Sequence, residues 1–424
     1  MNKNIFLIIT DCLRKDYFDK MEFSKKVDLS INNAYSVAPN TFFAVPSILT
    51  GTYPFQIIKN SKIMKSLYTF LPKIANQLEY LDIFITGNTV TSRAFGYYIN
   101  KGYFNDFFEK SESEIMRLKK ENNNKKNEII KYLNDYKKLK SLIKLVYNKF
   151  YKPIAFKITK NDFNIRNTSF ETKVRIEEIL NTFKNIEISK ENKYFGFIHL
   201  MDTHTPYGAP YLNKKKLEKA QEIIKKLYYM PLNLKKKEIE FLKELYEGEV
   251  DYLDKNLEIL INEIDKKFNL ENSLVVVVSD HGEAFGENGI FEHPGNGLIE
   301  EILHVPLSFI GKNANKIKID DKGIFSTRRI HEIISRYLFG EENIFIESSR
   351  EEIAFGYKRI GSSVIDSVYE ITNIAKINNK KIEVYDYSKE SEIQNDINDK
   401  LILERKIYLK NKISRNLYGY KLPK

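Results

Sequence analysis

Five short apolar runs constrain the fold of this chain more than any other feature of its sequence. Each is rich in Val, Ile, Leu, Phe or Tyr, and helical patterns separate them along the chain. They cover residues 5–9, 83–86, 194–200, 274–278 and 306–310. Buried parallel strands have this pattern, and their alternation with helices is typical of layered α/β folds. We therefore predict an α/β fold with a large, mostly parallel central sheet sandwiched by helices.

Polar residues follow three of these runs directly. Asp11 follows the first run, Asp202 and His204 follow the third, and Asp280 and His281 follow the fourth. In open α/β sheets the ligand lies beyond the carboxyl ends of the strands, so we expect these side chains to converge. A carboxylate beside an imidazole at a strand end suits a divalent metal ion. Taken alone, the Asp-His pair would fit a helix cap beside a surface histidine equally well.

Composition limits the other interpretations. The 424 residues, 42% of them hydrophobic, allow one large α/β unit or two to three domains. A net charge of +11 suits an anionic partner, but we expect no specific nucleic-acid binding from charge alone. The single cysteine, Cys12, excludes an internal disulfide and favours a reducing compartment. No run approaches the ~20 apolar residues of a membrane span, so we predict no transmembrane segment and a cytoplasmic protein.

Part of the positive charge lies in one segment. Residues 111–150 contain 11 Lys or Arg and 5 Asp or Glu, with apolar residues at helical spacing. We predict a basic helical insertion at about 111–190 that either covers the core as a solvated helix or contacts a membrane surface or acidic partner. Residues 213–243 are also basic and helical, with a break near Pro231, and lead into a helix at 245–264.

We divide the chain into two parts. A catalytic domain covers residues 1–310, including the basic insertion, and a smaller C-terminal region covers residues 311–424. Strand-like runs occur in the second part at 364–372 and 381–387.

Short motifs in a fixed order identify a family. Thr41 lies nine residues before Thr50-Gly51, which Tyr53-Pro54 follows. Further motifs lie at 8–16, 101–107, 199–207, 246–254 and 279–283, then at His293 and 304–307, and finally at 383–386 with Glu390 and Asn395. In this order the chain resembles the alkaline phosphatase and sulfatase superfamily, which includes sulfatases, phosphonate monoester hydrolases and phosphoethanolamine or phosphoglycerol transferases.

The resemblance implies an alkaline phosphatase-like fold with a small C-terminal α+β subdomain. It also implies one metal shell, formed by Asp11, Asp280, His281 and the oxygen of Thr41, with Thr41 as the nucleophile. A threonine hydroxyl is a weak nucleophile that a divalent cation activates by lowering its pKa. Thr41 also precedes an apolar run at a predicted helix start, where the backbone favours anions. The alternative is that Thr41 is only a helix cap.

Other residues receive roles from the same resemblance. His204 and His293 lie where the family has substrate-binding or second-metal histidines, and we expect them to bind substrate, transfer protons or hold a second ion. A purely structural histidine is the alternative for each. We expect Arg14 and Asn88 to contact substrate, although Arg14 would also suit orienting Asp11. Asp202 is a weaker candidate for a second metal, and we expect structural roles for His199, Asp254 and His304.

Departures from the family pattern narrow the chemistry. Sulfatases convert a Cys or Ser at the position of Thr41 into formylglycine, which threonine cannot form. They also carry a Lys and a His after the third strand, where this chain has residues 87–90 with Asn88. We therefore predict cleavage of a phosphate mono- or diester through phospho-Thr41, by hydrolysis or transfer.

Two alternatives stay open: a sulfatase that acts by another route, and a non-catalytic protein that binds anions or membrane surfaces. Two carboxylates, an imidazole and a hydroxyl favour Zn²⁺ or Mn²⁺ over Ca²⁺. We expect a phosphate- or sulfate-ester substrate, with lipid-linked and glycan-linked esters as two candidate classes, and peripheral membrane contact through the basic helices.

Overall fold

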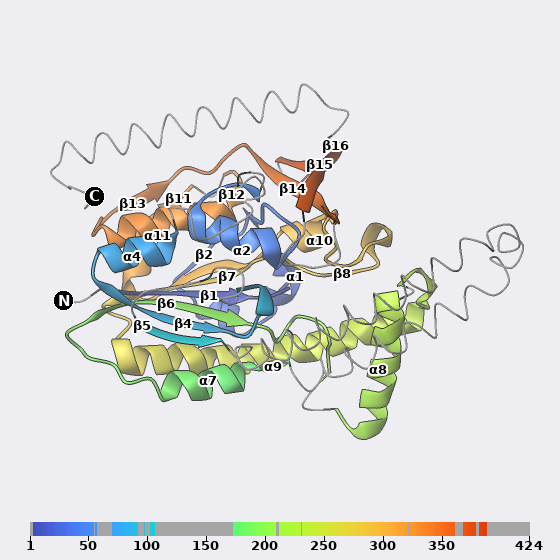
Figure 1. The fold of residues 1–424 in the computed structure, drawn as a ribbon, viewed down its shortest axis with the longest axis horizontal. Helices are drawn as coiled ribbons and strands as arrows, with labels where there is room; N and C mark the ends of the chain where they lie inside the picture. The colour runs from blue at the N-terminus through green and yellow to red at the C-terminus, as the bar shows by residue number, and fades with distance from the viewer. Residues whose placement is uncertain are drawn as a thin grey trace, which may run out of the picture.

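A mixed, mostly parallel sheet forms the centre of the computed structural model (Figure 1). The structure describes residues 3–54, 56, 70–91, 97, 102–106, 173–208, 212–229, 231–320, 322–360, 368–378 and 381–387. Within them the sheet has the order β2-β10-β7-β1-β6-β4-β5. The strands are β1 (Asn4–Thr10), β2 (Leu29–Ser30), β4 (Tyr80–Thr86), β5 (Gly102–Asp106), β6 (Lys193–Leu200), β7 (Ser273–Ser279) and β10 (Leu307–Ile310).

Strand direction confirms the predicted sheet and corrects one strand. β1 pairs in parallel with β6 and β7, and β4 pairs in parallel with β5 and β6. β10 pairs antiparallel with β7, so the prediction of a parallel strand at 306–310 was wrong. The reason is the path of the chain: residues 280–306 contain only short elements that follow the carboxyl end of β7, and β10 starts from that edge of the sheet.

Helices cover both faces of the sheet, as predicted (Figure 1). Alternating residues of β1 point to opposite faces. Ile5, Leu7 and Ile9 pack in one apolar core with residues of α2 (Thr41–Thr50), α4 (Leu71–Gln77) and α11 (Ile330–Leu338). Phe6 and Ile8 pack in a second core with α7 (Ile176–Lys184) and α9 (Lys236–Phe268).

The long helix α9 begins earlier than expected. The predicted break near Pro231 is present, because the short turn η5 (Pro231–Asn233) separates α8 (Lys214–Tyr229) from α9. The predicted helix at 245–264 is the middle of α9, whose first turns extend the apolar stripe with the buried residues Phe241 and Leu242. Among the described residues, no helix is long and apolar enough to cross a membrane.

A small antiparallel sheet near the C-terminus confirms the predicted subdomain. It contains β14 (Glu351–Ile360), β15 (Val368–Asn378) and β16 (Lys381–Asp386). The predicted strand at 364–372 overlaps β15, and the prediction at 381–387 agrees with β16. Ile353, Phe355 and Ile374 of this sheet pack against Val37 and Tyr53, near the helix that carries Thr41.

The remaining elements are short connections. They are α1 (Lys15–Phe18), η1 (Phe23–Lys25), β3 (Ala34–Tyr35), η2 (Thr89–Thr91), β8 (Ala284–Phe285), η6 (Glu287–Gly289), β9 (Phe291–Glu292), α10 (Glu300–Leu303), η7 (Lys312–Lys316), β11 (Ile317–Ile319), β12 (Phe325–Ser326), η8 (Thr327–Arg329) and β13 (Ile344–Ile346). The predicted basic segment at 111–150, Glu390 and Asn395 lie outside the described residues. The domain boundary at 310 stays a prediction.

Candidate active site

Three elements bring four predicted residues together at the carboxyl edge of the sheet. Asp11 follows β1, Asp280 and His281 follow β7, and Thr41 is the first residue of α2. Asp11, Asp280 and His281 are fully buried, and Thr41 is 6% exposed. Because β1 and β7 are parallel neighbours, their ends place the two carboxylates beside each other.

The distances among these side chains fit a shared ion. The Oγ1 of Thr41 lies 3.2 Å from Asp11 Oδ2 and 3.2 Å from His281 Nε2. His281 Nε2 lies 3.6 Å from Asp11 Oδ1 and 3.5 Å from Asp280 Oδ2. Ligand atoms of Asp11, Asp280 and His281 all lie within 4.8 Å of one another. One divalent cation could therefore contact three protein ligands and the threonine oxygen.

Two observations indicate that these residues fit a cation. Among the described residues, the buried Oδ2 of Asp280 has no hydrogen-bond partner, and burial together with the charge of Asp11 raises the pKa of Asp280 well above its usual value. Burial and the neighbouring His293 lower the pKa of His281 to about 3, so its ring is neutral. His281 Nδ1 donates to the carbonyl of Gly282 at 2.9 Å, which leaves the Nε2 lone pair facing the carboxylates.

Neighbouring side chains orient Asp11. Asn88 Nδ2 donates to Asp11 Oδ2 at 2.6 Å, and His199 Nε2 lies 3.2 Å from the same oxygen. Burial would raise the pKa of Asp11, but His204 and the hydrogen bond from His199 contribute to holding it well below its usual value. The amide of Asn88 is thus bonded to Asp11. Its expected contact with substrate stays a prediction. His199, for which we expected a structural role, contacts the proposed ligand Asp11.

A second group of titratable residues lies beside the first. Cys12 Sγ is 3.1 Å from Asp11 Oδ1 and 3.5 Å from His293 Nδ1. The ring centroids of His204 and His293 are 5.1 Å apart. Glu283 Oε1 accepts from His293 Nδ1 at 3.1 Å. Although burial opposes protonation, the Glu283 carboxylate raises the pKa of His293 to about 9.

Sequence comparison decides the family. The family model described as Sulfatase matches residues 3–335, which is most of the chain. The chain belongs to the sulfatase family. No curated protein sequence matches it significantly.

One solved structure shares the fold of this sulfatase-family chain, and two more show weaker similarity. A 2-O GAG sulfatase is 11% identical, with 100% of this chain and 95% of that chain covered and a TM-score of 0.51. A phosphonate monoester hydrolase from Silicibacter pomeroyi is 12% identical, covering 98% and 95%, with a TM-score of 0.49. The C-terminal periplasmic domain of a phosphoethanolamine transferase from Campylobacter jejuni is 13% identical, covering 80% and 90%, with a TM-score of 0.46.

Two other predicted residues of this sulfatase-family chain, Arg14 and Asp202, form hydrogen bonds outside the group of proposed ligands. Arg14 donates to Asp16 at 2.9 Å and to Glu287 at 3.0 Å, so its guanidinium is held by acidic partners other than Asp11. Its expected substrate contact stays a prediction. Asp202 Oδ1 accepts from the backbone N–H of Ile176 at 3.3 Å. Asp202 therefore contacts the first residue of α7.

Two expected structural residues have structural partners. Asp254 accepts from the backbone N–H groups of Glu22 and Phe23, each at 2.9 Å. The ring of His304 stacks on Tyr35 with the centroids 4.7 Å apart. Both contacts fix loops and involve none of the proposed ligands.

The loop that carries His204 depends on a residue that the sequence did not reveal. Lys173 Nζ donates to the carbonyls of Asp202, His204 and Pro206, the last two at 2.6 and 3.1 Å. It also lies 3.5 Å from Glu249 Oε1, and its side chain is 4% exposed. Burial lowers the pKa of Lys173 to about 8. A lysine whose partners are three backbone carbonyls of one loop has no signature in the sequence.

Proposed function

We propose that this chain is a metal-dependent hydrolase or transferase that cleaves a phosphate mono- or diester through a covalent phospho-Thr41 intermediate. The observation that carries the proposal is the position of the Thr41 hydroxyl, which lies 3.2 Å from both Asp11 and His281. A threonine that served only as a helix cap would have no need of these two partners.

Asp11, Asp280 and His281 would hold the cation. When bound, a divalent ion supplies Lewis acidity that stabilises the Thr41 alkoxide and the negative charge of the ester. Carboxylate, imidazole and hydroxyl ligands favour Zn²⁺ or Mn²⁺ over Ca²⁺. The unpaired Oδ2 of Asp280 supports this assignment, because a buried carboxylate oxygen normally has a partner.

The reaction has two steps, and different side chains transfer protons in each of them. In the first step Thr41 Oγ1, whose hydroxyl proton has been released to solvent, forms a bond to phosphorus, and the bond from phosphorus to the leaving oxygen breaks. His293, whose pKa is raised to about 9, donates a proton to that oxygen. The hydrogen bonds within α2 begin at the N–H of Phe43, which donates to the carbonyl of Asn40 at 3.3 Å, so the N–H groups of Thr41 and Phe42 before it suit the anionic ester.

The second step needs a base. Burial lowers the pKa of His204, and its Nδ1 is 2.6 Å from the carbonyl of Thr205, so the neutral ring presents Nε2 as an acceptor. His204 accepts the proton of water or of an acceptor hydroxyl as that oxygen attacks phospho-Thr41. As the new bond to phosphorus forms, the bond from phosphorus to Thr41 Oγ1 breaks and Thr41 leaves as the alkoxide, which completes either hydrolysis or transfer. His204 then loses its proton to solvent and His293 regains one.

Sulfate esters are the second candidate substrate. The family match and the fold similarity to a 2-O GAG sulfatase favour an enzyme that acts on esters in general. Threonine at position 41 cannot become formylglycine, so a sulfatase would need another route. We therefore propose a phosphate ester, attached to a lipid or a glycan, as the first candidate substrate. We also propose that the protein acts in the cytoplasm.

The exposed Lys side chains of α8 support contact with an anionic surface. Lys214, Lys215 and Lys216 begin this helix and are exposed, while Ile223 and Leu227 in its later turns are buried. This arrangement also supports the non-catalytic alternative, in which the fold only binds anions.

An activity assay separates these functions. Purified protein with Zn²⁺ or Mn²⁺ is offered bis-p-nitrophenyl phosphate, p-nitrophenyl phosphate and p-nitrophenyl sulfate. We expect turnover of a phosphate ester that falls by on the order of 10³-fold or more in Thr41→Ala and Asp280→Asn. Turnover of none of the three by the wild type would favour the binding protein. Undiminished turnover in Thr41→Ala would exclude Thr41 as the nucleophile.

A further inference from the structure

Asn40 is the N-cap residue of α2, but its side chain does not cap the helix. It directly precedes Thr41 and has extended backbone angles, with φ at −156° and ψ at 164°. An Asn at this position normally accepts a hydrogen bond, through its side-chain oxygen, from the N–H of the second or third helical residue. In α2 these residues are Phe42 and Phe43, and the Asn40 side chain makes no such bond. The side chain best placed to cap this helix is therefore directed elsewhere.

The hydroxyl of Tyr357 holds the Asn40 side chain. It donates to Oδ1 of Asn40, which is the oxygen that a helix cap would use. Tyr357 is 6% exposed, and burial raises the pKa of its hydroxyl well above the ordinary value, so the hydroxyl stays a donor. Its ring packs edge-on against Phe43, with the centroids 4.2 Å apart, and this contact fixes the direction of the hydroxyl.

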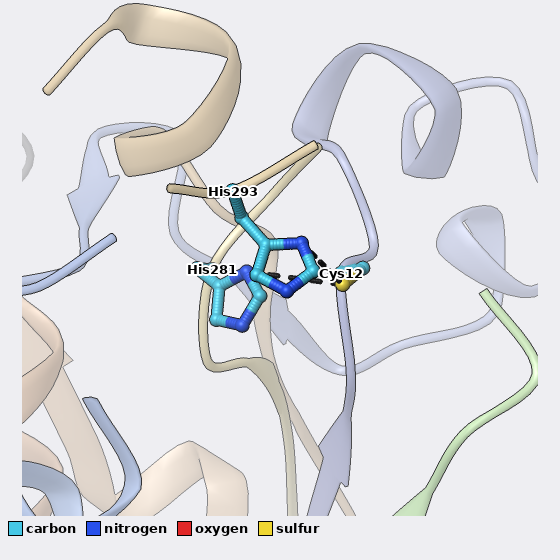
Figure 2. Close-up of side chains that lie close together, drawn as sticks. All are labelled: Cys12, His281 and His293. Carbon is cyan, nitrogen blue, oxygen red and sulfur yellow. Dashed lines mark hydrogen bonds between the residues drawn. The ribbon is translucent and has the colours of Figure 1, made fainter. Parts of the chain in front are cut away.

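The backbone of β14 fixes Tyr357 against the candidate active site. The N–H of Tyr357 donates to the carbonyl of Gly295 at 2.7 Å, in the loop that follows His293. The ring of His293 lies beside that of His281, with the centroids 4.6 Å apart (Figure 2). A Cβ on Gly295 would lie 2.5 Å from the Tyr357 carbonyl oxygen, so this close approach requires glycine. Tyr357 therefore contacts both the N-terminus of α2 and this loop.

The N-terminus of α2 is part of the proposed reaction site. Thr41 Oγ1 lies 3.2 Å from His281 Nε2. The buried Oδ2 of Asp280, which has no hydrogen-bond partner among the described residues, lies 3.5 Å from the same nitrogen. The Asn40 side chain and the anionic group of an ester would compete for the N–H groups at this helix end, because both offer oxygen acceptors. A cap formed by Asn40 would therefore weaken anion binding beside Thr41.

We propose that Tyr357 is a positioning residue that holds the Asn40 side chain away from the N-terminus of α2, so that this helix end binds the anionic group of the substrate. The inference rests on the proposed function, in which that group lies beside Thr41. It gives the small C-terminal sheet a role in substrate affinity, exerted through one hydroxyl of β14.

Anion binding tests the proposal without turnover. Protein supplied with Zn²⁺ is titrated with inorganic phosphate, and in a separate series with sulfate, by isothermal titration calorimetry. Tyr357→Phe keeps the ring but removes the donor, so Asn40 is released to cap α2. We expect the Kd for the anion to rise about fivefold, which corresponds to a cap of about 1 kcal/mol. Tyr385→Phe, which removes a hydroxyl bonded to Glu383 on β16 of the same sheet, is the control and should bind as the wild type does.

Removal of the competing side chain separates this role from a structural one. Asn40→Ala combined with Tyr357→Phe should bind the anion as tightly as Asn40→Ala alone, to within about twofold, because neither protein can form the cap. A role of Tyr357 only in packing would weaken binding equally with and without Asn40.

Three results would overturn the proposal: no anion binding by the wild type, unchanged affinity in Tyr357→Phe, or a loss of affinity that Asn40→Ala does not restore. The expected pattern depends on binding alone, so it is the same if Thr41 is not the nucleophile. Binding of sulfate but not of phosphate would count against the proposed ester and leave the role of Tyr357 standing.

Discussion

At the scale of single residues, Asp280 links metal binding to stability. Its carboxylate is fully buried beside Asp11, and its pKa is raised well above the usual value by burial and by that charge. A buried charge without a partner destabilises the fold until a cation neutralises it.

We predict that removal of the metal lowers the stability of the wild type. We also predict that the substitution Asp280→Asn raises the stability of the metal-free protein. At a Zn²⁺ concentration one hundred times Kd, the wild type should gain about 2.7 kcal/mol in the free energy of unfolding. Without metal, Asp280→Asn should be more stable than the wild type, and Zn²⁺ should stabilise it less. Urea unfolding with chelator or Zn²⁺ measures both, with Asp251→Asn on the exposed side of α9 as the control. The prediction would be contradicted if Zn²⁺ changed the free energy of unfolding equally in the wild type, Asp280→Asn and Asp251→Asn.

Asp82 gives a second prediction at this scale, away from the active site. Its side chain is buried on β4, where burial raises its pKa to about 8 even though Asn76 donates to it at 2.7 Å. Because the folded pKa exceeds the unfolded value of about 3.9, this residue contributes stability below that pH, and the contribution is lost as the pH rises through 8.

Asp82→Asn should therefore remove part of the pH dependence. The variant is expected to be more stable than the wild type at neutral pH by a few kcal/mol, and equally stable near pH 4. Unfolding free energies measured across this range test the sign. A variant that loses stability with rising pH as steeply as the wild type would show that Asp82 ionises normally in the fold.

At the scale of elements, Lys173 connects the segment before α7 to the loop that carries His204. Lys173→Met would leave three buried carbonyls without their donor, and we expect a loss of about 1–3 kcal/mol in stability. We also expect a fall in kcat, because the loop positions His204. Lys184→Met, at the exposed end of α7, is the matched control. The same stability and kcat in both variants would exclude this role for Lys173.

The strands were predictable because their sequence pattern depends on burial alone. β1, β6 and β7 are buried along nearly their whole length, so apolar side chains occupy consecutive positions. The direction of β10 was not predictable from its own residues, since direction depends on the path of the preceding loop. Three of the partners of Lys173 are backbone carbonyls, which carry no sequence code, and in a sequence a buried lysine looks like a solvated one.

At the scale of the whole molecule, the convergence of Asp11, Thr41, Asp280 and His281 followed from two independent predictions. One is the rule that polar residues meet at the carboxyl ends of parallel strands, and the other is the motif order of the sulfatase family. The sequence did not reveal that Cys12 would face His293, because that contact depends on a left-handed turn. It also did not show that His199 and Asn88 would share one oxygen of Asp11.

The stereochemical course at phosphorus tests the central claim most directly. A phosphate ester that the protein turns over is prepared with a chiral phosphorus, and the configuration of the product is determined. Two successive displacements, first by Thr41 and then by water or an acceptor hydroxyl, predict net retention. Inversion would mean a single direct displacement on the substrate, and it would contradict a covalent phospho-Thr41 intermediate.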